Sequence, residues 1–286
     1  MKKGYLHAIL SAFFFGLAGV LVKLALKTGL ESIQLIILQY MVSIPLLFIY
    51  IFITNKNKLK LTRRQLLNLI ILGVIGNAPM TIFYYSAFER LPAPIVTIIL
   101  YTYPFLIFVL NTLFFRRKID KKILVLIIIG FLGAVLTLNI IGGNNTYSSK
   151  GMFYALVAAI FFAFMNMFSE KKLGSIDAFV INTYSTFFSL LVLVLYNYDH
   201  MLFLTKTTLP IVINVGILSL FCEVLPLTLL YSGIKKIGGL KTSIIGNLEI
   251  PTAIILSALV LNEKLVIIQL VGVALISYTT YRIKAS

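Results

Sequence analysis

Residues 208–234 read TLPIVINVGILSLFCEVLPLTLLYSGI, and Glu223 is the only charged residue among them. A helix of about 20 apolar residues crosses the hydrocarbon core of a bilayer, so this stretch predicts a transmembrane helix. A second apolar run, residues 240–261, holds Glu249 well inside it. An ionised carboxylate near the bilayer centre costs a few kcal/mol or more, and such side chains usually face a watered cavity inside the protein.

The two glutamates therefore mark the first candidate site for a solute or a proton. Burial favours the neutral form of a carboxyl group, so we expect Glu223 and Glu249 to exchange protons close to neutral pH. The apolar surroundings of both residues in the sequence predict a negative patch halfway through the membrane.

Composition places the whole chain in the same class. Of its 286 residues, 60% are hydrophobic and 12% charged, against about 25% charged in an average soluble domain. The mean hydropathy is +1.01. Apolar runs recur along the entire length, which predicts an all-α integral membrane protein. The net charge of +16 comes from basic residues between these runs, where they meet lipid headgroups, so nucleic acid is not an expected partner.

We predict ten transmembrane helices joined by short connections. Their ranges are 5–27, 32–53, 65–88, 92–115, 121–140, 150–170, 176–196, 208–234, 240–261 and 265–283. No connection could hold a catalytic domain. The sequence contains no metal-binding motif, and we expect no cofactor. With the N-terminus inside, 19 of the Lys and Arg residues fall on the inner side and 6 on the outer side. This bias predicts that both termini are cytoplasmic.

The chain also resembles itself at an offset of about 147 residues. GYLHAILSAFFFG from Gly4 aligns with GMFYALVAAIFFA from Gly151, and Tyr85-Ser86 aligns with Tyr231-Ser232. We therefore predict two repeats, 1–143 and 144–286. Each holds five spans, an odd number, so the second must be inserted upside down. Inverted repeats are typical of transporters whose substrate site lies near the midplane between the halves. A duplication retained for folding alone is the alternative.

The stretch NLEIPTAIILSALVLNEKL, from Asn247 to Leu265, resembles the signature of the EamA-type branch of the drug/metabolite transporter superfamily. Glu249 and Glu263 match the two acids of that signature. Pro251 is displaced by one residue, and Asn262 replaces the usual Gly. In the first half, TYPFLIFVLNTLFFRRKI from Thr102 places Arg117 where the family often has Glu.

The resemblance extends over the whole chain. It implies ten helices in two inverted five-helix repeats, with the fifth and tenth helices peripheral and the others around a central cavity. It also implies a carrier of small metabolites. The substrate does not follow from it, because the family spans amino acids, nucleobases, vitamins, drugs and sugars.

Small and polar residues surround the two glutamates along the sequence. Glu249 lies eight residues after Lys241, about 12 Å into the membrane if helical, and either contacts a solute or proton or braces the bundle. Glu223 aligns with Asn77 in the first repeat. Its alternative role is that of a protonated core carboxyl group.

Other intramembrane polar residues complete the candidate substrate site. Lys23 could oppose the acids, or its amine could reach the headgroups. Tyrosine rings with hydroxyls suit cations and amphipathic solutes, and asparagines bind solutes or neighbouring helices. The predicted set, besides Lys23, is Glu249, Glu223, Asn77, Tyr84, Tyr103, Asn166 and Tyr231.

These features predict a multi-pass protein of the cytoplasmic membrane that moves a small amphipathic or cationic metabolite, such as an amino acid or amine, by alternating access. Proton coupling is one expectation. The partners expected are this solute and membrane lipids, for a monomer or homodimer. A membrane-embedded enzyme that uses the two carboxylates is an alternative, and a channel is another.

Overall fold

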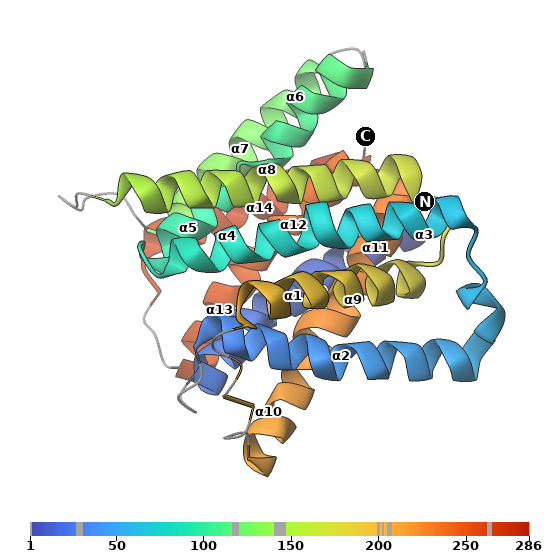
Figure 1. Ribbon diagram of the computed structural model, residues 1–286. Helices are drawn as coiled ribbons and strands as arrows, with labels where there is room; N and C mark the ends of the chain where they lie inside the picture. Colours follow the sequence, from blue (N-terminus) through green and yellow to red (C-terminus); the bar gives the residue numbers. More distant parts are fainter. Residues whose placement is uncertain are drawn as a thin grey trace.

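The structure is a computed structural model that describes residues 2–26, 31–115, 120–139, 147–198, 201, 203–204, 208–261 and 265–285. These residues form helices and connections, without a strand among them (Figure 1). The predicted all-helical class is therefore confirmed. The helices of the first half are α1 (Lys2–Leu26), α2 (Ser32–Asn55), η1 (Lys56–Leu59), α3 (Arg63–Ile71), η2 (Leu72–Asn77), α4 (Ala78–Phe88), α5 (Ala93–Leu100), α6 (Tyr103–Phe115) and α7 (Lys121–Thr137).

The second half is also helical. Its helices are α8 (Ser149–Lys172), α9 (Ala178–Tyr196), α10 (Leu209–Ser219), η4 (Leu220–Val224), α11 (Leu225–Ile237), α12 (Gly239–Gly246), α13 (Glu249–Leu261) and α14 (Ile267–Ala285). Within the described residues, seven helical stretches are long and apolar enough to cross a membrane: 33–59, 63–88, 93–113, 149–172, 178–196, 211–237 and 239–260. The division into units 1–143 and 144–286 stays a prediction.

A proline explains a widened turn in the middle of two of these stretches. Pro79 and Pro226 lack an N–H, and a proline ring crowds the carbonyl one turn earlier. The residue before each proline instead donates to the carbonyl five residues back, Ala78 to Gly73 and Leu225 to Leu220. The π-helical turns η2 and η4 result. Such turns are rare in proteins, and those that occur are often found at functional sites.

Two other predicted helices are interrupted, which corrects the prediction of single helices over 92–115 and 240–261. The chain turns at Tyr101–Thr102 between α5 and α6, and at Asn247–Leu248 between α12 and α13. Pro104 and Pro251 follow within the first turn of α6 and α13, where a missing N–H is tolerated. Glu249 is therefore the first residue of α13 and not a residue in mid-helix.

Helices that are distant in the sequence pack side by side. Helix α1 runs along α11 and α13, and α7 lies along α14. The crossing of α7 and α14 depends on Gly133 and Gly272, because a Cβ atom on Gly272 would lie 2.5 Å from the Gly133 carbonyl oxygen. Tyr5, near the start of α1, donates to the Ile283 carbonyl near the end of α14 at 3.4 Å. Both ends of the chain thus lie on one side (Figure 1).

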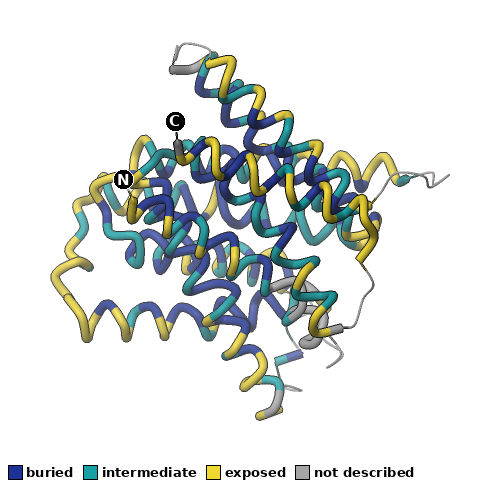
Figure 2. The backbone as a smooth tube through the Cα atoms, turned by 180° about the vertical axis from the view of Figure 1, so that it is seen from behind, coloured by how far each residue is buried: buried dark blue, intermediate teal, exposed yellow. Residues whose placement is uncertain are grey.

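The surface of the bundle is rich in exposed apolar side chains. Buried residues face inward and exposed residues face outward along the outer helices (Figure 2). Ile53, Leu195 and Ile267 are 78%, 75% and 82% exposed, respectively. Large exposed apolar surface is unusual for a protein in water and is what contact with lipid requires.

Candidate functional site

Glu223 lies in the π-helical turn η4 and is only 7% exposed. Its Oε1 accepts a hydrogen bond from Thr186 Oγ1 of α9 at 2.9 Å. The buried carboxyl group is therefore held by a neighbouring helix and not by residues of its own helix.

The hydrogen bond from Thr186 belongs to a longer chain. Thr186 Oγ1 also lies 3.0 Å from Asn182 Oδ1, and Asn182 Nδ2 donates to Thr228 Oγ1 at 3.0 Å and to the Val224 carbonyl at 3.3 Å. A hydroxyl carries one proton and can donate to only one acceptor. When Glu223 is ionised, the Thr186 hydroxyl can donate a hydrogen bond to Glu223 or to Asn182, but not to both. When Glu223 is protonated, it can donate to Thr186, which then donates to Asn182.

Three tyrosines lie within electrostatic range of Glu223: Tyr40, Tyr85 and Tyr231. The Tyr231 hydroxyl lies 3.4 Å from Ser185 Oγ. Asn77 joins this group indirectly, because its Oδ1 accepts from the Tyr40 hydroxyl at 3.5 Å. The Asn77 Nδ2 is buried and has no partner among the described residues. Predicted residues Glu223, Asn77 and Tyr231 are thus brought together in what we call the Glu223 cluster.

Glu249 stands at a different place, at the start of α13. The positive end of a helix dipole favours a carboxylate there. Helix α1 approaches closely at Gly16, where a Cβ atom would lie 2.8 Å from the Glu249 carbonyl oxygen. Glu249 is partly exposed, whereas Glu223 is buried. This segment of α1 and the break before α13 therefore flank Glu249.

Tyrosines from the first half surround Glu249. Tyr84, Tyr101 and Tyr103 lie near enough to interact with its charge. The Tyr103 hydroxyl donates to the Ser243 carbonyl of α12 at 3.1 Å. The hydroxyl of Tyr101 is buried without a hydrogen-bond partner of good geometry in the described structure, and the Glu249 carboxyl group is its neighbour. We call these four residues the Glu249 cluster.

The predicted site is therefore divided. Tyr84 and Tyr103 accompany Glu249, while Asn77 and Tyr231 accompany Glu223. Asn166 Nδ2 donates to the Phe162 carbonyl of its own helix at 2.9 Å, and no contact described here links it to either carboxyl group. The side chain of Lys23 lies outside the described residues.

Sequence reasoning left Thr186, Tyr85, Tyr40 and Tyr101 out of the predicted site. A signal for Thr186 was available: α9 carries a polar stripe of Asn182, Ser185, Thr186 and Ser189, all fully buried. Such a stripe at helical spacing on one face indicates a polar contact within the bundle. A signal for Tyr85 was its alignment with the predicted residue Tyr231 in the repeat, whereas nothing in the sequence distinguished Tyr40 from the tyrosines elsewhere in the chain.

Among the described residues, no three His, Cys, Asp or Glu side chains come together as a metal site. The structure also describes two hollows, both at the end of the bundle formed by α2, η1 and the start of α3. Neither is lined by Glu223 or Glu249.

Comparisons with known proteins agree on one family. A family model described as the EamA-like transporter family matches residues 2–139 and 149–281. A protein named as an uncharacterized transporter of Clostridium kluyveri is 25% identical over 293 residues, covering 96% of this chain and 91% of that one. The uncharacterized transporter YetK of Bacillus subtilis is 24% identical and covers 83% of this chain and 73% of its own.

Two further similarities add a functional name and a fold. The pseudopaline exporter CntI of Pseudomonas aeruginosa is 27% identical over 165 residues, covering 57% of this chain and 55% of that one. A protein crystal structure matches with a TM-score of 0.75 at 16% identity, and covers 96% of this chain and 94% of that chain. At this identity the likeness concerns the fold alone.

Proposed function

Because the chain belongs to the EamA-like transporter family and is a multi-pass protein of the cell membrane, we propose that it is a secondary carrier of a small solute. The proposed mechanism is alternating access between two inverted five-helix repeats. The seven apolar stretches become ten spans when α1, α7 and α14 are included. An even number of spans places both termini on one side, and the hydrogen bond between Tyr5 and the Ile283 carbonyl supports this arrangement.

The repeated helix breaks support the proposed inversion. The turns at Tyr101–Thr102 and Asn247–Leu248 are 146 residues apart, which is the offset of the tyrosine-serine pairs at 85–86 and 231–232. Each half also has a π-helical turn that directly precedes a helix with proline as its second residue. Interrupted helices at matching positions of two halves are the usual location of a transporter's binding site.

The observation that carries the proposal is the Glu249 cluster. It combines the carboxyl group of a half-buried glutamate, three phenol rings and, on Tyr101, a buried hydroxyl that has no hydrogen-bond partner of good geometry in the described structure. A carboxylate attracts a cation, and tyrosine rings contact both cations and apolar groups. We therefore assign this cluster to a small amphipathic or cationic metabolite, such as an amino acid or amine. A solute that forms a hydrogen bond with the Tyr101 hydroxyl would bind more tightly than a solute that cannot.

The Glu223 cluster supports proton coupling. Its hydrogen bonds are complete only when the carboxyl group is protonated, because Thr186 otherwise cannot serve both Glu223 and Asn182. Loss of the proton leaves an acceptor in α9 unpaired, which biases the packing of α9 against α11. In this proposal Glu223 binds the coupling proton and Glu249 binds the solute. The name of the exporter among the relatives favours export as the direction.

Counterflow in proteoliposomes tests the proposal. Candidate amino acids and amines are first screened for a rise in the unfolding temperature of purified protein, because a ligand stabilises the state that it binds. We expect saturable counterflow of a stabilising solute, abolished by Glu249→Gln. Glu223→Gln should retain solute binding but remove the dependence of net transport on a proton gradient. If both variants transport at the wild-type rate with the wild-type pH dependence, the assignment is wrong.

The two alternatives predict other outcomes. A channel would show flux without saturation and without counterflow. An enzyme that shares a proton between two carboxylates requires them to be adjacent, whereas Glu223 and Glu249 belong to separate clusters. Turnover of a lipid or peptide by the purified protein would favour the enzyme.

A further inference from the structure

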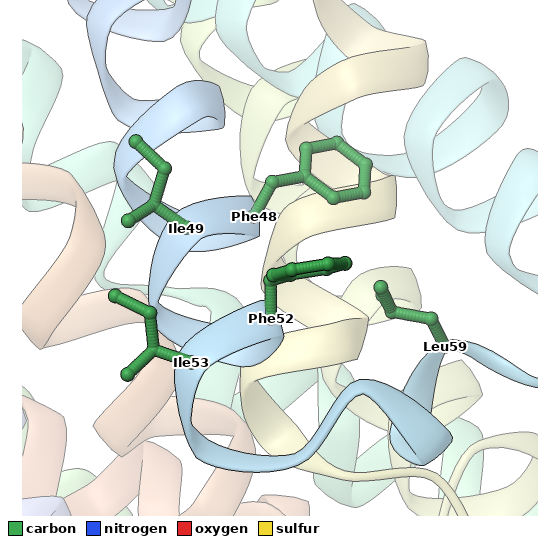
Figure 3. Close-up of a pocket in the computed structure, with 5 residues that line it drawn as sticks. All are labelled: Phe48, Ile49, Phe52, Ile53 and Leu59. Atoms are coloured by element: carbon green, nitrogen blue, oxygen red, sulfur yellow. The ribbon is translucent and has the colours of Figure 1, made fainter.

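Two hollows lie near the end of α2, and their chemistry differs. One has a volume of about 270 Å³ and is lined by Phe48, Ile49, Phe52, Ile53 and Leu59 (Figure 3). The other has a volume of about 280 Å³ and is lined by Asn57, Lys58, Lys60, Leu61, Gln65, Ser175, Ile176, Asp177 and Lys235. The short helix η1 joins them, because Leu59 of the apolar hollow stands between Lys58 and Lys60 of the polar hollow.

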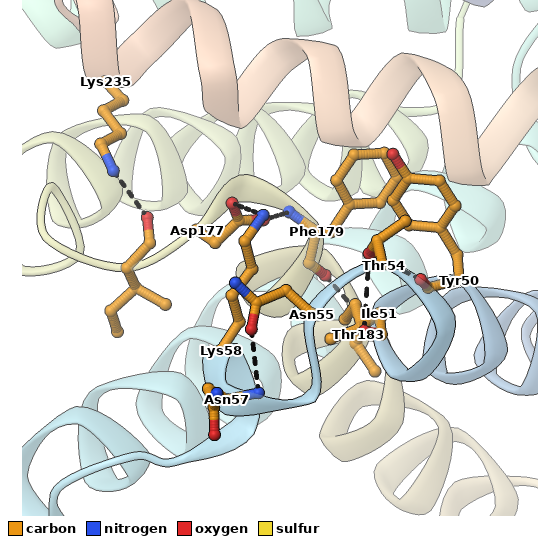
Figure 4. A network of polar contacts seen from close by, with 11 residues as sticks. Tyr50, Ile51, Thr54, Asn55, Asn57, Lys58, Asp177, Phe179, Thr183 and Lys235 are labelled. Atoms are coloured by element: carbon orange, nitrogen blue, oxygen red, sulfur yellow. Dashed lines mark hydrogen bonds and ion pairs between the residues drawn. The ribbon is translucent and has the colours of Figure 1, made fainter.

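The polar hollow carries excess positive charge. Lys58 Nζ lies 2.8 Å from Asp177 Oδ2, so this pair is neutral (Figure 4). Lys235 Nζ donates to the Ile176 carbonyl at 3.1 Å. That bond uses one of the three donors of the ammonium group and leaves its charge unneutralised. Lys60 makes no ion pair or hydrogen bond through its side chain in the described structure. The hollow therefore offers two ammonium groups to an anion.

The apolar hollow faces outward on the membrane-spanning helix α2. Its lining contains no polar side chain, and Phe52 and Ile53 are 65% and 78% exposed. Leu59 faces the same hollow as Phe52 (Figure 3), so the apolar groove extends from α2 to the short helix that carries Lys58. The cationic hollow would then stand at the level of lipid headgroups, with the apolar groove at the level of the acyl chains.

We propose that this composite site binds one phospholipid with an anionic headgroup. The phosphate and its substituents occupy the polar hollow beside Lys60 and Lys235, and an acyl chain lies along Phe48, Phe52 and Leu59. Basic pockets beside membrane helices are a known form of recognition for acidic lipids. A soluble anion would use the lysines alone, whereas a lipid uses both hollows at once. The inference does not depend on the transported solute.

Native mass spectrometry of the purified protein tests the site directly. The protein is equilibrated in detergent with equimolar dioleoylphosphatidylglycerol and dioleoylphosphatidylcholine, and the lipids retained on it are identified by mass. We expect one phosphatidylglycerol to be retained in preference to phosphatidylcholine. Each lysine near a membrane surface contributes about fivefold to the attraction of an acidic lipid. The double variant Lys60→Gln/Lys235→Gln should therefore lower the preference by about 25-fold.

Matched variants separate this site from general surface charge. Lys121→Gln/Lys122→Gln removes the same charge from exposed positions at the start of α7 and should leave the preference unchanged. Phe52→Ser should lower retention of phosphatidylglycerol, whereas Phe105→Ser, an exposed phenylalanine of α6, should not. Equal loss in both members of either pair would overturn the site.

Two measurements on the wild-type protein alone also test the proposed lipid site. Equal retention of phosphatidylglycerol and phosphatidylcholine would refute recognition of the headgroup. Competition by inorganic phosphate or by glycerophosphoglycerol, which lacks acyl chains, distinguishes a lipid from a free anion. We expect neither to displace the lipid at equal concentration. Displacement would mean that the hollow is a soluble-anion site, and the proposal of a lipid would be wrong.

Discussion

Tyr84 and Tyr85, adjacent in α4, serve different carboxyl groups: Tyr84 interacts with Glu249 and Tyr85 with Glu223. Their rings are 5.8 Å apart and nearly perpendicular, at 81°. Consecutive residues on a helix point about 100° apart, so α4 places one tyrosine within electrostatic range of each glutamate. A shift of α4 that moves one tyrosine toward its glutamate must also move the other. This helix therefore connects the proposed solute and proton sites.

The hydrogen bond from Thr186 to Glu223 is the first to test. Thr186→Val keeps the shape of the side chain but removes its hydroxyl, which should lower the free energy of unfolding by about 0.5–2 kcal/mol. Thr183→Val is the matched control, because Thr183 is equally buried in α9 and donates only to Phe179 of its own helix. Thermal unfolding in detergent measures both. An equal effect in the two variants would show that the bond to Glu223 contributes nothing.

The two hydroxyls near Glu249 should behave oppositely. Tyr101→Phe removes a buried hydroxyl without a hydrogen-bond partner of good geometry, so stability should stay constant or rise by about 1 kcal/mol, while solute affinity falls. Tyr103→Phe removes the bond to the Ser243 carbonyl and should cost about 1 kcal/mol of stability. Unfolding temperature and solute-induced shift are measured on each variant. Unchanged affinity in Tyr101→Phe would remove this hydroxyl from the solute site.

The proline after η4 should matter more for transport than for stability. In Pro226→Ala the new N–H can donate to the Cys222 carbonyl, which lets η4 return to regular α-helix and rotates Glu223 away from Thr186. Alanine is the better helix former, so stability should be kept or increased while proton-driven transport declines. Pro45→Ala, in the interior of α2, is the control. Transport at the wild-type rate in Pro226→Ala would show that the widened turn is dispensable.

The crossing of α7 and α14 should tolerate no added methyl group. In Gly272→Ala the new Cβ atom would overlap the Thr137 side chain and the Gly133 carbonyl, and overpacking of this kind costs about 1–3 kcal/mol. Gly216→Ala in α10 meets no atom within 4 Å and should be neutral or stabilising. The unfolding midpoints of the two variants provide the comparison. A harmless Gly272→Ala would mean that the two helices can separate freely.

Orientation is tested by labelling single cysteines in intact cells. Cys222 is buried, so it is first replaced by Ala. Cysteines are then introduced at Lys58 or Lys121, on the side predicted to be cytoplasmic, and at Lys150, on the side predicted to be external. A membrane-impermeant maleimide should label only the last of these before lysis. Labelling of position 58 or 121 in intact cells would reverse the orientation proposed here.

The sequence allowed the helices to be predicted well, because a run of apolar residues of bilayer length has few alternatives to a helix. The interruption before Glu249 was not predicted, since Asn247 and Leu248 are unremarkable in a helix and the effect of Pro251 depends on where its helix begins. The widened turn at Glu223 was not predicted, because a proline such as Pro226 can instead leave the carbonyl one turn earlier without a partner. Whether that carbonyl is left free or the turn widens depends on neighbouring helices.

The site was predicted less completely than the fold. Glu223 and Glu249 were found because a charge among apolar residues is conspicuous, but their separation into two clusters depends on how helices cross. Tyr84 and Tyr85 illustrate the difficulty. They are identical neighbours in the sequence, and only the packing of α4 assigns them to different acids. Thr186 was within reach of a pattern argument, since it lies one turn after Asn182 in α9.

The close seam between Gly133 and Gly272 also has a consequence for biogenesis. Helix α14 (Ile267–Ala285) is synthesised long after its partner α7 (Lys121–Thr137). Until residues 267–285 are inserted, the face of α7 that carries Gly133 lies in the membrane without its partner helix. A nascent chain released early would therefore expose the face of α7 that normally packs against α14. Membrane quality-control proteases can recognise an incomplete protein by such an unpaired helix face.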